Sequence, residues 1–351
     1  MPVVDDENEL HDQDLSTIFN QHFHRSTDDG IIDLSGNYWY LVQENELANF
    51  VSLFEGIIGV PMGRILHNSA ADCLELILSP VSSMKFGMFA SKKRNKLLSK
   101  YWKIFGWGRY DWKADSINTA VYASIISGFY LAVVEQQHGD RRKIQWRQLA
   151  ENLIQCDVEE IQKTLPAPKF LPDMPWVFQS KQSGTSINRL LESHDYGWSI
   201  DGKQSFVLPC DLINRIIFNS GGYVENLSRT TSQHWHVTGI DKRFSASMIC
   251  VMQSFKEVFS ASDVFVYLNE ANNWESVISN HLVPFGLGSV QHVESANDID
   301  VFTVKKMPNA PILIGKLAGL WERANGKQSK CKIHLTDQDF LVNIQSLLGY
   351  N

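Results

Sequence analysis

The chain has 351 residues, and its 32 basic and 39 acidic side chains give a formal net charge of −7. Hydrophobic residues make up 44% and charged residues 20% of the sequence, which is typical of a globular protein and excludes a disordered or fibrous chain. The length corresponds to about two domains. No run of about 18 apolar residues occurs, so we expect no transmembrane segment.

The cysteines predict a reducing environment. They are widely spaced, with no pair at the CxxC spacing: Cys73, Cys156, Cys210, Cys250 and Cys331. This spacing argues against a zinc ribbon and against a dense disulfide framework. Residues 1–20 also lack the apolar stretch of a secretory signal. We therefore expect a cytoplasmic protein.

The first thirty residues are predicted to form a mobile acidic arm. They carry many aspartate and glutamate residues and few large apolar ones. Such a segment buries too little surface to offset the entropy lost on ordering.

The first folded unit is predicted over residues 31–162. Its residues 38–42 favour a strand, and a helix from 123 to 138 that is apolar on two sides indicates burial. Apolar residues at helical spacing predict three further helices between these elements. The remaining predicted elements of this unit are helices at 46–54, 62–78 and 92–104, and strands at 107–113, 117–121 and 143–146.

A linker rich in proline, serine and glycine is predicted over residues 163–201. Four prolines lie within ten positions: Pro166, Pro168, Pro172 and Pro175. Because proline lacks an amide donor and restricts the residue before it, a continuous helix or central strand is excluded there.

The second unit, predicted over residues 202–351, repeats the pattern of the first. A Phe-Gly-x-Gly motif begins at Phe105 and again at Phe285, a glycine-containing helix includes Gly128 and later Gly315, and that helix closes at Gly139 and later Gly326. Three anchors in the same order indicate a tandem duplication. We therefore predict an α+β fold of two tandem repeats, each a helical layer packed on a small antiparallel sheet.

This order of elements and these motifs resemble the four-vinyl-reductase domain. The resemblance is carried by Gly106, Gly108, Gly286 and Gly288 and by the segment 309–319. That family includes bacterial and archaeal small-molecule sensors and the Bet-type subunits of the TRAPP vesicle-tethering complex. The resemblance implies helices that enclose an apolar pocket, used for hydrophobic ligands in sensors and for lipid groups or partner helices in tethering subunits. It does not imply catalysis.

The glycines inside the two apolar helices mark the predicted ligand site. A glycine costs about 1 kcal/mol relative to alanine in a helix, so close approach of a neighbouring backbone or of a ligand should compensate. Both alternatives stay open. If a ligand compensates, it is a small hydrophobic molecule or an acyl group, held by Gly128, Phe129, Val133, Gly315, Leu317, Ala318 and Trp321.

A basic stretch in the first unit is the second candidate site. We assign an anionic partner to Lys92, Lys93, Arg94, Lys96, Lys100, Trp102 and Lys103. The partner is an acidic protein surface, anionic lipid headgroups or nucleic acid, although the signal for nucleic acid is not strong. The alternative is a solvated helix face, covered by the acidic arm of the chain itself.

The sequence offers little support for metal, cofactor or catalytic chemistry. Two His-x-His pairs, at 22–24 and 234–236, lack further ligands at a recognised spacing, so we interpret them as exposed polar positions. Gly106-Trp107-Gly108 lacks the third glycine and the helix of a dinucleotide site. Glu135 and Glu322 hold equivalent helix positions, which we expect to be solvated. We predict no metal and no cofactor.

The sequence thus predicts a non-catalytic binding or interaction protein, an intramolecular pseudo-dimer of two similar units. One alternative is a structural subunit of a larger assembly. A less favoured alternative is an enzyme acting on a tetrapyrrole- or isoprenoid-like substrate.

Overall fold

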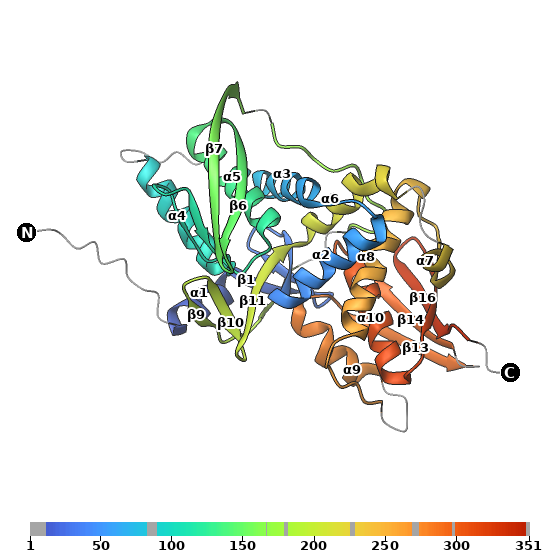
Figure 1. The fold of residues 1–351 in the computed structure, drawn as a ribbon. Coiled ribbons are helices and arrows are strands. Elements are labelled where there is room, and N and C mark those ends of the chain that lie inside the picture. The colour runs from blue at the N-terminus through green and yellow to red at the C-terminus, as the bar shows by residue number, and fades with distance from the viewer. Residues whose placement is uncertain are drawn as a thin grey trace, which may run out of the picture.

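The computed structural model describes residues 12–82, 90–165, 167–178, 182–224, 229–268, 274–296 and 299–348. Within these residues the helices pack against three sheets whose strands are mostly antiparallel (Figure 1). This confirms the predicted α+β class. No described helix combines the length and the apolar character needed to cross a membrane.

The central sheet has seven strands in the order β8-β1-β2-β3-β11-β10-β9 and joins distant parts of the chain. Its middle strand β3 pairs antiparallel with its neighbour β11, with Trp39 opposite Pro209 and Gln43 opposite Ser205. The strands are β1 (Phe23–Ser26), β2 (Ile31–Asp33), β3 (Tyr38–Gln43), β8 (Gln182–Ser186), β9 (Glu192–His194), β10 (Gly197–Ile200) and β11 (Lys203–Pro209).

The first half continues from β3 into helices and then into a four-stranded sheet of order β4-β5-β7-β6. Helix α5 ends at Gly139, whose left-handed backbone (φ 77°) lets its amide donate to the carbonyl oxygen of Glu135. The elements are α2 (Glu44–Ile58), α3 (Gly63–Ser82), α4 (Ala90–Ile104), β4 (Arg109–Asp111), β5 (Ser116–Asn118), α5 (Ala123–His138), β6 (Asp140–Ala150) and β7 (Leu153–Thr164).

The second half continues from β11 in a similar way, into a five-stranded sheet of order β12-β15-β16-β14-β13. Its helices and 3-10 turns are α6 (Cys210–Ser220), η1 (Gly221–Tyr223), α7 (Arg229–His234), α8 (Lys242–Ser260), α9 (Trp274–His281), η2 (Val283–Phe285) and α10 (Ala310–Asn325). Its strands are β12 (Trp235–Thr238), β13 (Val290–Ala296), β14 (Ile299–Lys305), β15 (Ser329–Leu335) and β16 (Asp339–Ser346).

The two halves share an order of elements. In each, a hairpin is followed by a buried helix and a second hairpin: β4-β5-α5-β6-β7 in the first half and β13-β14-α10-β15-β16 in the second. The strands also take the same places in the sheets, β4-β5-β7-β6 and β13-β14-β16-β15. The second half adds α7 and β12, which pairs in parallel with β15. An origin by duplication stays a prediction.

The halves are joined by helices as well as by β3 and β11. Helix α2 of the first half packs on α8 of the second, and α6 of the second packs on α3 of the first. At the first of these contacts the rings of Phe50 and Phe255 stack, with centroids 4.3 Å apart. The two halves therefore share one apolar core.

The prediction of a mobile acidic arm is wrong for residues 12–30. Residues 12–22 form helix α1 (Asp12–His22), and β1 and β2 begin immediately after it. Phe19 and Phe23 are buried and their rings lie 4.8 Å apart, which offsets the cost of ordering this segment. The rest of the predicted arm, residues 1–11, lies outside the described residues.

The prediction of a linker over residues 163–201 is wrong as well. Strand β7 runs to Thr164, and β8, β9 and β10 all belong to the central sheet. Trp176 and Trp198 are completely buried, so this segment contributes to the core. The prolines do prevent a helix, but the strands lie after them and toward the two edges of the sheet, where pairing demands less of the backbone.

Candidate binding cleft

The two helix glycines at the predicted ligand site contact neighbouring helices. A Cβ atom on Gly128 would overlap the carbonyl oxygen of His67 in α3, and a Cβ on Gly315 would lie 2.5 Å from the carbonyl oxygen of Met252 in α8. Of the two alternatives left open by the sequence, backbone packing is therefore the one the structure contains.

The other predicted ligand residues lie in the same packed layer. Phe129, Val133, Leu317 and Ala318 are buried, and the indole N–H of Trp321 donates to Asp300 at 2.7 Å. None of the seven lines the cleft described below. The structure thus assigns Gly128, Phe129, Val133, Gly315, Leu317, Ala318 and Trp321 to packing, in place of the predicted ligand contact.

The predicted basic site lies on helix α4 but does not include its tryptophan. Trp102 is buried and donates to the carbonyl oxygen of Trp107 at 2.8 Å, so it cannot contact a partner. Arg94 donates to the carbonyl oxygen of Gln136 in α5 at 3.1 Å. The side chain of Lys92 lies outside the described residues. The remaining predicted residues, Lys93, Lys96, Lys100 and Lys103, are exposed or half-buried.

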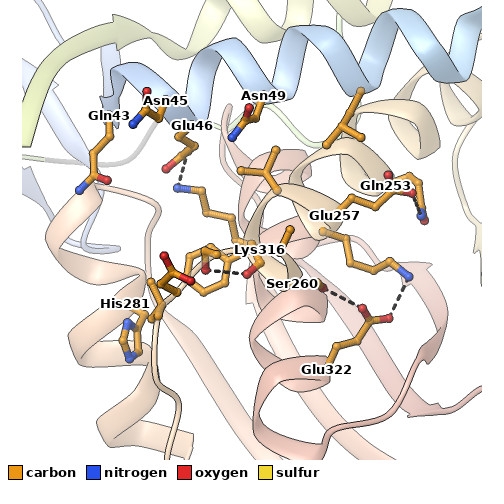
Figure 2. Close-up of a pocket in the computed structure, with 18 of the residues that line it drawn as sticks. Gln43, Asn45, Glu46, Asn49, Gln253, Glu257, Ser260, His281, Lys316 and Glu322 are labelled. Atoms are coloured by element: carbon orange, nitrogen blue, oxygen red, sulfur yellow. Dashed lines mark hydrogen bonds and ion pairs between the residues drawn. The ribbon is translucent and has the colours of Figure 1, made fainter.

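A polar cleft of about 1360 Å³ lies where α2 of the first half meets α8, α9 and α10 of the second. Figure 2 shows Gln43, Asn45, Glu46 and Asn49 on the α2 side, with Lys316 reaching toward them from α10. Carboxamides recur around the cleft: Gln43, Asn45, Asn49, Gln253, Asn280 and Gln328. Apolar side chains, among them Leu53 and Phe285, and the charged side chains of Lys203, Glu257 and Asp263 also line the cleft.

Lys316 pairs with a carboxylate from the other half of the chain. Its ammonium lies 2.6 Å from Glu46 Oε1 in α2 and 5.1 Å from the centroid of the Phe285 ring. The Lys316 side chain is only 1% exposed, so this charge depends on Glu46 for compensation. An ammonium carries three donors. One of these donors faces Glu46. Lys316 is also one of the residues that line the cleft.

A second lysine–glutamate pair lies at another part of the cleft. Lys256 Nζ is 2.9 Å from Glu322 Oε1, and Glu322 also accepts hydrogen bonds from Ser260 at 2.7 Å and from the Ser329 amide at 2.7 Å. Burial alone would raise the pKa of Glu322. The charge of Lys256 and these hydrogen bonds outweigh it, so the pKa lies below its ordinary value.

Two histidines at the cleft stay neutral near pH 7. Burial lowers the pKa of His281, and burial together with the charge of Lys256 lowers the pKa of His234. Lys316 and Lys256 are paired to glutamates, and the other charged residues of the lining are Lys203, Glu257 and Asp263. Most of the uncharged polar side chains that line the cleft carry amide or hydroxyl groups.

The glutamates that the sequence placed at solvated helix ends are buried instead. Glu135 lies 2.6 Å from Arg141 and accepts a hydrogen bond from the Arg142 amide at 2.9 Å. Glu322 accepts from the amide seven residues later in the same way. Each carboxylate thus links the end of its helix to the start of the next strand. The expectation of solvation was wrong because the following strand folds back over the helix end.

Sequence reasoning missed the lysines of the cleft. The available signal for Lys316 was a single charge within the otherwise apolar run of residues 310–321, which requires a buried partner. Nothing in the sequence pointed to Glu46 as that partner, because the two lie 270 residues apart.

The histidine pairs do not gather further ligands. Among the described residues, no three His, Cys, Asp or Glu side chains are placed to hold a metal ion. His22 instead contacts the rings of Phe23 and Tyr101. His234 lies beside Lys256, with 3.5 Å between His234 Nδ1 and Lys256 Nζ.

Comparison of the chain with family models, with curated proteins and with solved structures gives no match.

Proposed function

We propose that this chain is a non-catalytic binding protein whose two halves hold a small, uncharged, hydrogen-bonding ligand in the cleft between α2 and α8–α10. The observation that supports this most directly is the lining, which draws polar side chains from both halves around a volume of about 1360 Å³. Ligand sites commonly occur where two structural units meet.

The chemistry of the lining selects the class of ligand. A carboxamide both donates and accepts hydrogen bonds, so a lining rich in them suits a molecule with alternating donors and acceptors, such as a polyol or a peptide-like amide. The ion pairs Lys316–Glu46 and Lys256–Glu322 are neutral overall, and with Lys203, Glu257 and Asp263 the lining has a formal net charge of only −1 (3 − 4) to attract an ion. The region of apolar residues around Gly128 and Gly315 is filled by packing and supports no hydrophobic ligand.

The four-vinyl-reductase relationship is also a proposal. It is supported by the shared element order of the halves and by the close helix packing at Gly128 and Gly315. A cytoplasmic location is proposed from the five cysteines, all of which are free and buried.

Native mass spectrometry of protein purified gently from its own cells tests the ligand proposal. We expect an additional mass that denaturation releases, with one ligand per chain. In an Asn49→Trp variant the added ring would occupy the cleft and the additional mass should disappear. Asn49 is exposed, so the fold should tolerate the change.

Ala48→Trp is the matched control, because Ala48 is also exposed on α2 but does not line the cleft. It should retain the additional mass. A chain without any bound molecule would contradict the proposal. Copurification with partner proteins alone would favour the alternative of a structural subunit.

A further inference from the structure

The exposed face of helix α4 carries a row of lysines that the cleft does not explain. The row consists of Lys93, Lys96, Lys100 and Lys103, spaced by three, four and three residues. Side chains at these spacings lie on one face of a helix. With a rise of about 1.5 Å per residue, the lysine row spans about 15 Å along the axis.

The opposite face of α4 is fixed to the protein. Leu98 and Trp102 are buried, and Arg94 is held by the carbonyl oxygen of Gln136. Figure 1 shows α4 at the outer side of the first half, on the side of that half away from the second half. The row thus lies on a helix whose other face packs against the protein.

The lysine row is not neutralised within the described part of the chain. None of its four ammonium groups is among the ion pairs formed there. The whole chain nevertheless has a net charge of −7. A negatively charged surface would therefore attract this face and repel most of the remaining protein, which fixes the orientation of approach.

We propose that the lysine row docks the protein on an anionic phospholipid surface. The row is formed by lysines alone, which act as point charges and suit an array of headgroups that offers no fixed geometry. The only arginine among the predicted basic residues, Arg94, is engaged with Gln136.

Nucleic acid and an acidic protein fit this face less well. Binding of single strands relies on aromatic side chains that stack on bases. Trp102 and Trp107 beside the row are buried, and the half-buried rings of Tyr101, Tyr110 and Trp112 pack on other aromatic rings of the chain. Protein interfaces are centred on aromatic or arginine anchors and are depleted in lysine.

Cosedimentation with vesicles tests the proposal, using phosphatidylcholine alone and phosphatidylcholine mixed with phosphatidylserine. We expect binding to the mixed vesicles only, and its loss at high salt. Each lysine near such a surface contributes a factor of about 5 in affinity, so a double variant Lys96→Gln/Lys100→Gln should bind about 25-fold more weakly.

The matched control is Lys242→Gln/Lys332→Gln, which removes the same charge from exposed lysines of the second half. It should bind almost as tightly as the unaltered protein. Equal binding by the Lys96/Lys100 variant, equal loss in the control, or no preference for phosphatidylserine would overturn the proposal. Tighter binding to a single-stranded oligonucleotide at the same salt would overturn the choice of lipid.

Discussion

His67 illustrates how the surroundings of one residue set a pH dependence. Its ring stacks on Trp146 with centroids 4.6 Å apart, and its Nδ1 lies 2.9 Å from Ser127 Oγ. Burial, with a smaller contribution from Arg64, lowers the pKa of His67 to about 4. In the unfolded chain the pKa of His67 is near 6.5. Between about pH 4 and pH 6.5 the unfolded chain therefore binds a proton on His67 that the folded chain does not bind.

The free energy of unfolding should therefore fall as the pH drops below about 6.5 and level off near pH 4. Urea unfolding at several pH values would measure this slope. A His67→Gln variant should lose the part of the slope due to this group. An unchanged slope would show that the imidazole is not excluded from protonation in the folded state.

Residue roles differed in how far the sequence could predict them. Gly128 and Gly315 were marked by their cost within apolar helices, and close packing was one of the two readings. Glu46 and Lys316 could not be paired from the sequence, because a charge pair between distant segments leaves no local pattern. The candidate site therefore emerged only from the three-dimensional structure.

At the scale of elements, the contact between α8 and α10 depends on Gly315. A methyl group there would lie 2.5 Å from the backbone of Met252, which cannot move without shifting α8. We expect Gly315→Ala to lower the free energy of unfolding by about 1–3 kcal/mol.

Gly56 in α2 provides the matched comparison, because a Cβ there would meet nothing within 4 Å. Gly56→Ala should raise the free energy of unfolding by up to about 1 kcal/mol through helix propensity. Chemical denaturation of both variants measures the difference. A stabilising effect of Gly315→Ala would contradict the packing role.

The elements themselves were predictable where their pattern is local. Helix α5 begins and ends at the predicted residues, because its apolar sequence and Gly139 act within a few turns. Strands β8 to β10 were missed because their stability comes from pairing with β1 and β11, far away in sequence. Helix α1 was missed because its burial depends on a few aromatic residues within a polar segment.

At the scale of the whole molecule, the pair Lys316–Glu46 couples the two halves. Removing either partner leaves a buried charge without compensation, so Glu46→Leu or Lys316→Met should each cost about 3–5 kcal/mol of unfolding free energy. The double variant Glu46→Leu/Lys316→Met should recover most of that loss.

A double-mutant cycle by urea unfolding would measure this coupling. The exposed pair Lys143–Glu159, at 3.3 Å, is the control, and Glu159→Gln should cost no more than about 1 kcal/mol. Strictly additive costs for Glu46 and Lys316 would show that the two side chains act independently.

The pairing of β3 with β11 also has a consequence for synthesis of the chain on the ribosome. In the central sheet β3 pairs with β11, whose residues lie roughly 170 positions later in the chain. One edge of β3 therefore has no partner strand until β11 has been synthesised. Loop closure of this length slows folding and leaves a strand edge exposed in the meantime. The nascent first half should therefore require protection from aggregation until translation passes Pro209.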